Sequence, residues 1–289
     1  MQISAGGVAI EVDDVGQGEP LLLLMGLGMQ LVSWPDELVA ELVARGFRVI
    51  RIDNRDVGLS QGFDHLGKAN LIAATVRHML GMRISAPYSL ADMARDSFGV
   101  LDALGVASAH VCGVSMGGMI AQHMATMYPE RVRRLTLMMT TSGSRSLPQP
   151  SARIRRALLS RPANSRDPEE IVAHLERMFA LIGSPDYHTD PELFRRRLRA
   201  SVARAWRPAG VARQIVAIVA DGDRTPMLGR ISAPTHIVHG ASDPLVPVAA
   251  AHQLHRKIRG STLEVIPGMG HDLPVPLLPR LAHEIARTD

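Results

Sequence analysis

Short apolar runs alternate with helical patterns along most of this chain, and this alternation limits the folds open to it more than any other feature. Apolar-rich runs of strand length occur at residues 21–25, 47–52 and 109–114, and the first of them is uninterrupted. Strands that are apolar throughout and alternate with helices are typical of a parallel sheet covered on both faces. The sequence therefore predicts an α/β fold, with a mostly parallel sheet and helices on both of its faces.

The same pattern predicts the remaining elements before residue 141 and after residue 233. Ser89, followed three residues later by Asp92, forms a capping box, which predicts a helix that ends at Gly105. Further strands are expected at 8–12, 132–139, 235–239 and 263–266, and further helices at 35–44, 116–127, 248–258 and 277–287.

The alternation stops between residues 142 and 232. This stretch is punctuated by prolines, has helical spacing and carries 16 arginines against 9 acidic residues, in a chain of net charge +4. We predict a helical insertion at 142–232 between two parts of one α/β core, residues 1–141 and 233–289. Aromatic residues make up only 3% of the chain, so the basic charge indicates a solvated helical surface and no nucleic-acid partner is expected.

Composition narrows the other classes of function. The 289 residues include one cysteine, Cys112, so no intrachain disulfide can form. The longest apolar run is far below the roughly 20 residues needed to span a bilayer, and the first residues lack the pattern of a signal peptide. A cytoplasmic protein with no membrane span is expected. His252 and His255 have helical spacing but no third ligand, so neither a metal nor a cofactor is expected.

Ser115 is the candidate nucleophile. It lies in the pattern Gly113-Val114-Ser115-Met116-Gly117, after the predicted strand 109–114 and before the predicted helix 116–127. In this context the serine occupies a sharp turn, and the two glycines leave room for the backbone to fold back. The pattern therefore indicates a serine activated for nucleophilic attack.

Asp243 and His271 are the candidate acid and base. Asp243 follows the predicted strand 235–239, and His271 follows the predicted strand 263–266. Loops after parallel strands meet at the same edge of a sheet. The order Ser, Asp, His along the chain is that of a hydrolase triad.

Two backbone N–H groups are candidates for an oxyanion hole. One belongs to Met116, the residue after the nucleophile, and the other to Leu27, in the loop after the strand at 21–25. Gly26 and Gly28 flank Leu27 and would let its backbone approach a substrate closely.

With these motifs, the sequence resembles the α/β-hydrolase superfamily over nearly its whole length, and within it the esterases related to aclacinomycin methylesterase. The stretch 25–60, which includes Ser33-Trp34-Pro35-Asp36-Glu37, carries the closer resemblance. Met25 stands where many relatives have histidine, but the oxyanion donor is a backbone N–H and does not depend on that side chain. The resemblance implies that 142–232 covers an active site.

The leading hypothesis is hydrolysis of a small-molecule carboxylic ester. His271 would take the proton of Ser115, Asp243 would orient His271, and an acyl-enzyme would form and then be hydrolysed. Serine members of the superfamily also include C–C bond hydrolases and cofactor-free perhydrolases, and a non-catalytic ligand-binding protein is a further alternative. The cap arginines Arg195, Arg196, Arg197 and Arg199 cannot all face one pocket, and the low aromatic content predicts an acyl pocket lined by aliphatic side chains.

Overall fold

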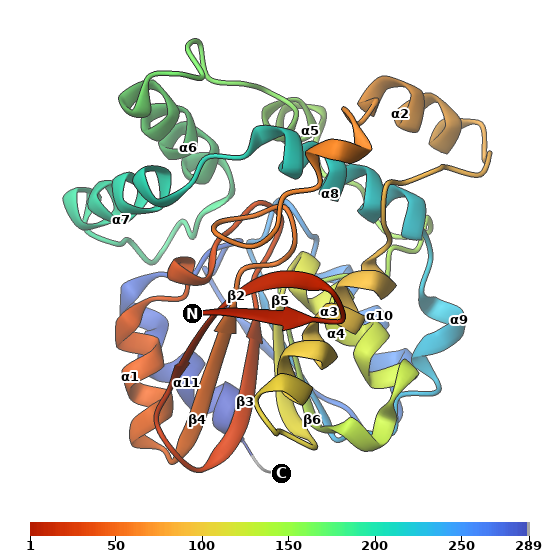
Figure 1. The fold of residues 1–289 in the computed structure, drawn as a ribbon, viewed down its shortest axis with the longest axis vertical. Helices are drawn as coiled ribbons and strands as arrows, with labels where there is room; N and C mark the ends of the chain where they lie inside the picture. The colour runs from red at the N-terminus through yellow and green to blue at the C-terminus, as the bar shows by residue number, and fades with distance from the viewer. Residues whose placement is uncertain (288–289) are drawn as a thin grey trace.

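The computed structural model describes residues 1–287, whose strands form one sheet in the order β1-β2-β4-β3-β5-β6-β7-β8 (Figure 1). The pairs β1–β2 and β2–β4 are antiparallel, and every other neighbouring pair is parallel. The predicted, mostly parallel sheet is confirmed. Its strands are β1 (Gln2–Ala5), β2 (Val8–Val15), β3 (Glu19–Leu24), β4 (Phe47–Ile52), β5 (Ala109–Val114), β6 (Val132–Met138), β7 (Thr235–Gly240) and β8 (Thr262–Ile266).

Helices cover both faces of this sheet. In β3, Leu21 and Leu23 pack into the apolar cluster that contains α1 and α11, whereas Leu22 and Leu24 pack into the cluster that contains α3, α4 and α10. Successive side chains of a strand point to opposite faces, so one apolar strand serves both clusters. The covering helices are α1 (Asp36–Ala44), α3 (Leu90–Ala103), α4 (Met116–Met127), α10 (Ala249–Lys257) and α11 (Leu278–Ala286).

The start of the chain departs from the prediction. The strand expected at 8–12 is the second strand, because β1 precedes it and pairs with it as an antiparallel hairpin. Four residues with only Ala5 buried leave too weak a hydrophobic pattern to reveal a strand. The helix α2 (Leu71–Met79) also lies in a stretch for which no element was predicted.

Between β6 and β7 the chain is helical. It forms α5 (Ala152–Leu158), α6 (Pro168–Ile182), α7 (Pro191–Arg204), α8 (Pro208–Asp221) and the short α9 (Thr225–Leu228). Figure 1 shows α5 to α8, together with α2, on one side of the sheet, beyond the loops that follow its parallel strands. None of the helices within residues 1–287 is both long and apolar enough to cross a membrane.

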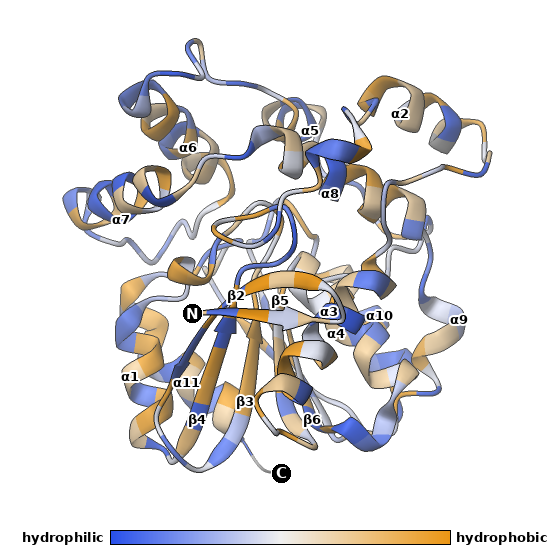
Figure 2. Cartoon of the chain, viewed as in Figure 1, coloured by the Kyte–Doolittle hydropathy of each residue, from blue (hydrophilic) through white to orange (hydrophobic). Residues whose placement is uncertain are grey.

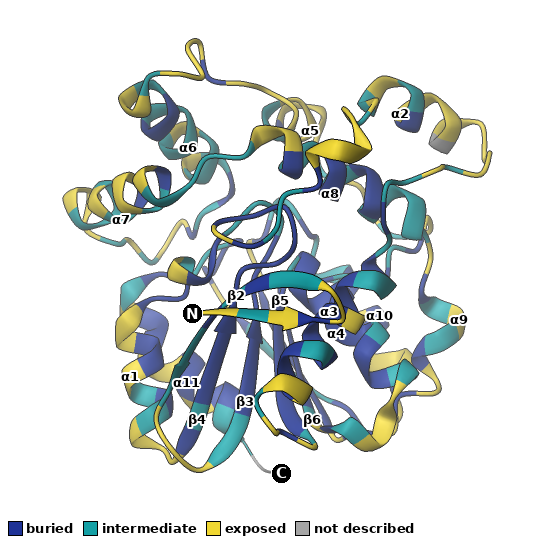
Figure 3. Ribbon diagram, viewed as in Figure 1, coloured by how far each residue is buried: buried dark blue, intermediate teal, exposed yellow. Residues whose placement is uncertain are grey.

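The inserted helices differ from the sheet in polarity and burial. Figure 2 shows apolar residues along β3 and a largely hydrophilic α7, and Figure 3 shows buried strands beneath helices with many exposed positions. Between α6 and α7 only a small apolar cluster is buried, made of Ile171, Val172, Leu198 and Val202.

Candidate active site

Ser115 stands on a strained turn between β5 and α4. Its backbone has φ 55° and ψ −119°, a left-handed conformation that costs a residue other than glycine free energy. A Cβ at Gly113 would overlap the carbonyl of Gly117, and a Cβ at Gly117 would overlap the carbonyl of Leu24. Both glycines are therefore required by close backbone contacts, which is the reason that the sequence interpretation gave for them.

Asp243 and His271 are brought together at the ends of β7 and β8. His271 Nδ1–H donates to Asp243 Oδ2 at 2.7 Å, and the other carboxylate oxygen accepts the N–H groups of Leu245 and Val246, each at 2.8 Å. The carboxylate is fully buried, and the two backbone contacts to one of its oxygens leave the other directed toward His271. In the neutral ring with its proton on Nδ1, where this carboxylate accepts it, the Nε2 atom of His271 has a lone pair that can accept a proton.

His239 also contacts this carboxylate, and the sequence interpretation missed it. Its Nε2 lies 3.5 Å from Asp243 Oδ2 and donates to the carbonyl of Val246 at 2.8 Å. Burial lowers the pKa of His239, so the ring stays neutral at pH 7. The signal that could have revealed this contact is a histidine four residues before Asp243 in the sequence.

The two predicted oxyanion donors both lie near Ser115. Within residues 1–287, neither the Leu27 N–H nor the Met116 N–H donates to another group of the protein. Met116 begins α4, and the first N–H groups of a helix have no partner within the helix. A Cβ on Gly26 would lie 3.2 Å from Ser115 Cβ, so the loop of Leu27 passes directly beside the serine. The Ser115 hydroxyl has no hydrogen-bond partner among the described residues.

A cavity of about 2260 Å³ connects these residues. Ser115, His271, Leu27 and Met116 line it, whereas Asp243 lies behind His271. The expectation of a purely aliphatic lining is wrong. The overall scarcity of aromatic residues did not reveal that four of the ten line the cavity, namely Phe179, Tyr187, Phe194 and Trp206.

Three of the five arginines of α7 are paired with glutamates. Arg195 contacts Glu176 at 2.9 Å and Glu169 at 3.0 Å, and Arg199 contacts Glu169 at 2.7 Å. Hydrogen bonds from the two arginines lower the pKa of Glu169 to about 2. Arg197 lines the cavity but reaches Glu37 of α1 at 2.6 Å, so these side chains bind helices to one another.

The end of α6 holds the loop that carries His271. The His271 N–H donates to the carbonyl of Ile182 at 2.7 Å, and the Gly270 N–H donates to Ser184 Oγ at 2.9 Å. Ser184 in turn donates to Asp272 at 2.5 Å. Burial raises the pKa of the Asp272 carboxyl, and the hydrogen bonds with Ser184 offset only part of that rise.

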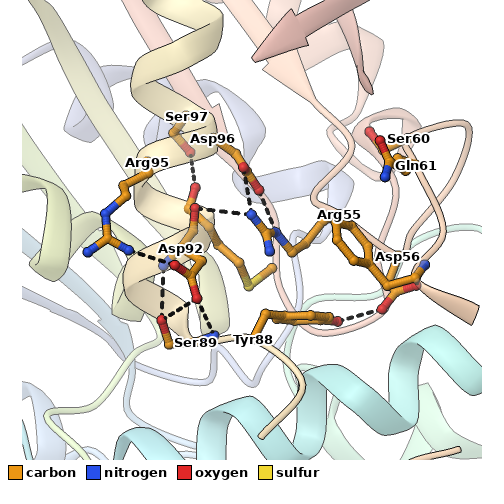
Figure 4. Close-up of polar contacts among 12 residues, drawn as sticks. Arg55, Asp56, Ser60, Gln61, Tyr88, Ser89, Asp92, Arg95, Asp96 and Ser97 are labelled. Atoms are coloured by element: carbon orange, nitrogen blue, oxygen red, sulfur yellow. Dashed lines mark hydrogen bonds and ion pairs between the residues drawn. The ribbon is translucent and has the colours of Figure 1, made fainter. Parts of the chain in front are cut away.

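A buried polar network lies under the loop that follows β4. Arg55 donates to both carboxylate oxygens of Asp96, at 2.6 and 2.7 Å, and Tyr88 donates to Asp56 at 2.8 Å (Figure 4). Arg213 of α8 donates to both oxygens of Asp56 at 2.7 Å. Burial alone would raise the pKa of Asp56, but these hydrogen bonds, led by that of Arg213, hold it below its ordinary value.

The fold and the strand-to-helix serine turn define a hydrolase of α/β type. The chain belongs to the α/β-hydrolase fold family, whose model matches residues 19–275.

Several proteins resemble this chain over most of its length. It is 32% identical to the rhodomycin D methylesterase of Streptomyces sp. (strain C5), over 92% of this chain and 89% of that protein. It is 29% identical to a 2-hydroxy-6-oxononadienedioate/2-hydroxy-6-oxononatrienedioate hydrolase of Klebsiella pneumoniae, over 94% and 88%. A solved structure of a mutant meta-cleavage product hydrolase from Pseudomonas fluorescens IP01 superimposes with a TM-score of 0.76 at 21% identity, covering 99% and 96% of the two chains. The predicted family and its methylesterase branch are confirmed.

Proposed function

We propose that this protein hydrolyses a small-molecule carboxylic ester, with Ser115 as nucleophile, His271 as general base and Asp243 as the group that orients His271. The observation that carries the proposal is that one cavity holds Ser115 on its strained turn and His271 with its Nδ1–H bound to a buried Asp243. The methylesterase relative supports the ester as the bond that is cleaved.

In the proposed reaction, His271 Nε2 takes the hydroxyl proton as Ser115 Oγ attacks the ester carbonyl carbon. The carbonyl oxygen becomes an oxyanion that accepts the N–H groups of Leu27 and Met116. His271 then gives its proton to the leaving alcohol, and the acyl group stays on Ser115. Water, deprotonated by His271, attacks this acyl-enzyme. His271 then returns the proton to Ser115 Oγ as the bond to the acyl group breaks, which releases the acid and restores the free serine.

We further propose that residues 142–232 act as a cap and that the substrate has a bulky apolar acid part. The cavity volume far exceeds that of a short-chain ester. Phe179, Phe194 and Trp206 supply flat apolar surface to stack against rings. A methyl ester with a bulky, ring-containing acid part fits this lining, and the methylesterase name of the relative agrees with the ester group. The cytoplasmic location stays a prediction.

Replacing the nucleophile tests the proposal directly. Ser115→Ala is expected to lower kcat for a p-nitrophenyl ester by about 10³-fold or more, since no acyl-enzyme can form. Ser97→Ala is the matched control, because the Ser97 hydroxyl only donates to Met93 within α3. A fluorophosphonate probe should label the wild-type protein and not the Ser115 variant. Unlabelled wild-type protein would instead support the ligand-binding alternative.

Hydrolysis of a C–C bond is the second candidate. The Klebsiella relative at 29% identity, which carries the name of a dienedioate hydrolase, favours it. The two functions separate when a coloured vinylogous diketone and a bulky aromatic methyl ester are supplied to the same preparation. Faster turnover of the diketone, measured as kcat/KM, would favour C–C hydrolysis over the ester reaction.

A further inference from the structure

Gln214 of α8 joins the loop after β3 to the loop after β4 through both ends of its side-chain amide. Its Oε1 accepts the Gly28 N–H at 2.9 Å, and its Nε2 donates to the carbonyl of Arg55 at 2.9 Å. One partner only donates and the other only accepts, so the orientation of the amide is fixed. The side chain is fully buried and does not line the cavity.

The contact at Gly28 constrains the residue beside it. Gly28 has φ +67°, and a Cβ there would lie 2.9 Å from Val211 Cγ2, so α8 packs directly against this loop. The Met29 N–H donates to the Gly26 carbonyl at 3.2 Å and closes a tight turn around Leu27. A hydrogen bond to the Gly28 N–H fixes the peptide plane that follows Leu27, and thereby limits how the Leu27 N–H can rotate.

The other end of the amide rests on a rigid support. The Arg55 guanidinium is held by both oxygens of Asp96 and lies over the rings of Phe63, at 4.9 Å, and Tyr88, at 5.1 Å. Figure 4 shows this side chain enclosed between α3 and the loop after β4. The Arg55 carbonyl therefore gives Gln214 a fixed point from which to hold Gly28.

We propose that Gln214 is a positioning residue, which sets the direction of the Leu27 N–H and occupies the neighbouring Gly28 N–H. This inference rests on the proposed ester hydrolysis. An oxyanion donor acts only when it lies about 2.7–3.1 Å from the developing charge. A residue of the inserted segment thus completes an oxyanion hole whose donors both belong to the sheet core.

Gln214→Leu keeps the size of the side chain and removes both hydrogen bonds. We expect kcat for a p-nitrophenyl ester to fall by about 10- to 100-fold, less than the loss of a donor itself, with KM changed by less than about threefold. The Ki of a boronic acid, which forms a tetrahedral adduct on Ser115, should rise by the same factor as kcat falls.

Gln122→Leu is the matched control. Gln122 is equally buried and also links the core to the inserted segment, through Thr141 and Arg224, but it touches neither the cavity nor the Leu27 loop. Its kcat at a temperature where both variants are folded should stay within about threefold of wild type. Equal losses of kcat in the two variants would overturn the proposal, because the effect would then be general destabilisation.

Gln214→Glu covers the case in which the leucine variant does not fold. It retains an acceptor for the Gly28 N–H, and as the neutral acid, the form that burial favours, it can still donate to the Arg55 carbonyl. It is therefore expected to keep at least about a third of the wild-type kcat. A loss as large as about 100-fold in this variant would overturn the proposal. Failure of the proposed function would be distinguishable, since wild-type protein would then neither react with a fluorophosphonate nor hydrolyse the ester.

Discussion

The sheet and the helices inserted between β6 and β7 are stabilised by different interactions. Both faces of the sheet are covered by large, fully buried apolar clusters, whereas α6 and α7 share only a small one. The inserted segment packs Ala217 of α8 and Leu228 of α9 into one of these clusters. Its other contacts with the core include polar ones made by Arg213, Gln214 and Ser184. These contacts end on the loops after β3, β4 and β8, which carry or adjoin the candidate site. The sheet is thus stabilised mainly by apolar packing, whereas the polar contacts of the inserted segment hold the loops that form the candidate site.

The largest expected difference is in the free energy of unfolding when the same substitution, leucine to alanine, is made in each of the two regions. Leu22→Ala is expected to lower the free energy of unfolding by about 4 kcal/mol, since Leu22 is fully buried in a close-packed cluster. Leu198→Ala is expected to cost about 2 kcal/mol, because the small α6–α7 cluster can collapse around the gap. Urea unfolding followed by circular dichroism measures both. Equal costs would mean that the inserted helices are as tightly packed as the sheet.

Breaking the polar docking is expected to have the next largest effect. Arg213→Met leaves the Asp56 carboxylate buried without its charge partner, which should cost about 3 kcal/mol of stability. Adding Asp56→Asn to this variant should recover part of the loss, because the neutral amide is less costly to bury. Thermal and urea unfolding of the single and double variants test this. A double variant less stable than Arg213→Met would contradict the role assigned to the buried charge.

The smallest expected effect concerns pH. Burial raises the pKa of Asp272 above its ordinary 3.8, so its ionisation is less favourable in the folded than in the unfolded state. The contribution of Asp272 to the free energy of unfolding of the wild-type protein therefore falls as the pH rises above about 4. Asp272→Asn, which keeps the acceptor for Ser184, should remove this fall and be more stable than wild type at pH 7 but not at pH 3. Parallel pH profiles from urea unfolding would contradict the prediction.

Local backbone chemistry made much of the core predictable. The capping box of Ser89 and Asp92 is present and begins α3 as predicted. The glycines around Ser115 indicated a sharp turn because any Cβ there meets backbone atoms. Loops after parallel strands must share an edge, so the meeting of Asp243 and His271 followed from the strand pattern.

The docking of the inserted helices could not be predicted in this way. Gln214 and Gly28 are far apart in sequence, and nothing in the spacing of either residue marks the other as its partner. The arginines of α7 gave the same difficulty, because their pairing with Glu169 and Glu176 depends on how α6 packs against α7. The gathering of Phe179, Phe194 and Trp206 at the cavity likewise results from tertiary packing, which composition does not encode.

The inserted segment leaves and rejoins the core at neighbouring points. The Ser142 carbonyl accepts the Arg224 N–H at 2.8 Å, and the Thr141 carbonyl accepts its guanidinium at 2.9 Å. The residues between these two points form a loop that is closed at its base. The entropic cost of closing a loop grows only with the logarithm of its length. A chain built in this way can acquire a new substrate preference through exchange of one whole segment. The replacement segment would need its own equivalents of Gln214 and Ser184. Two short sets of hydrogen bonds therefore limit which segments can be exchanged.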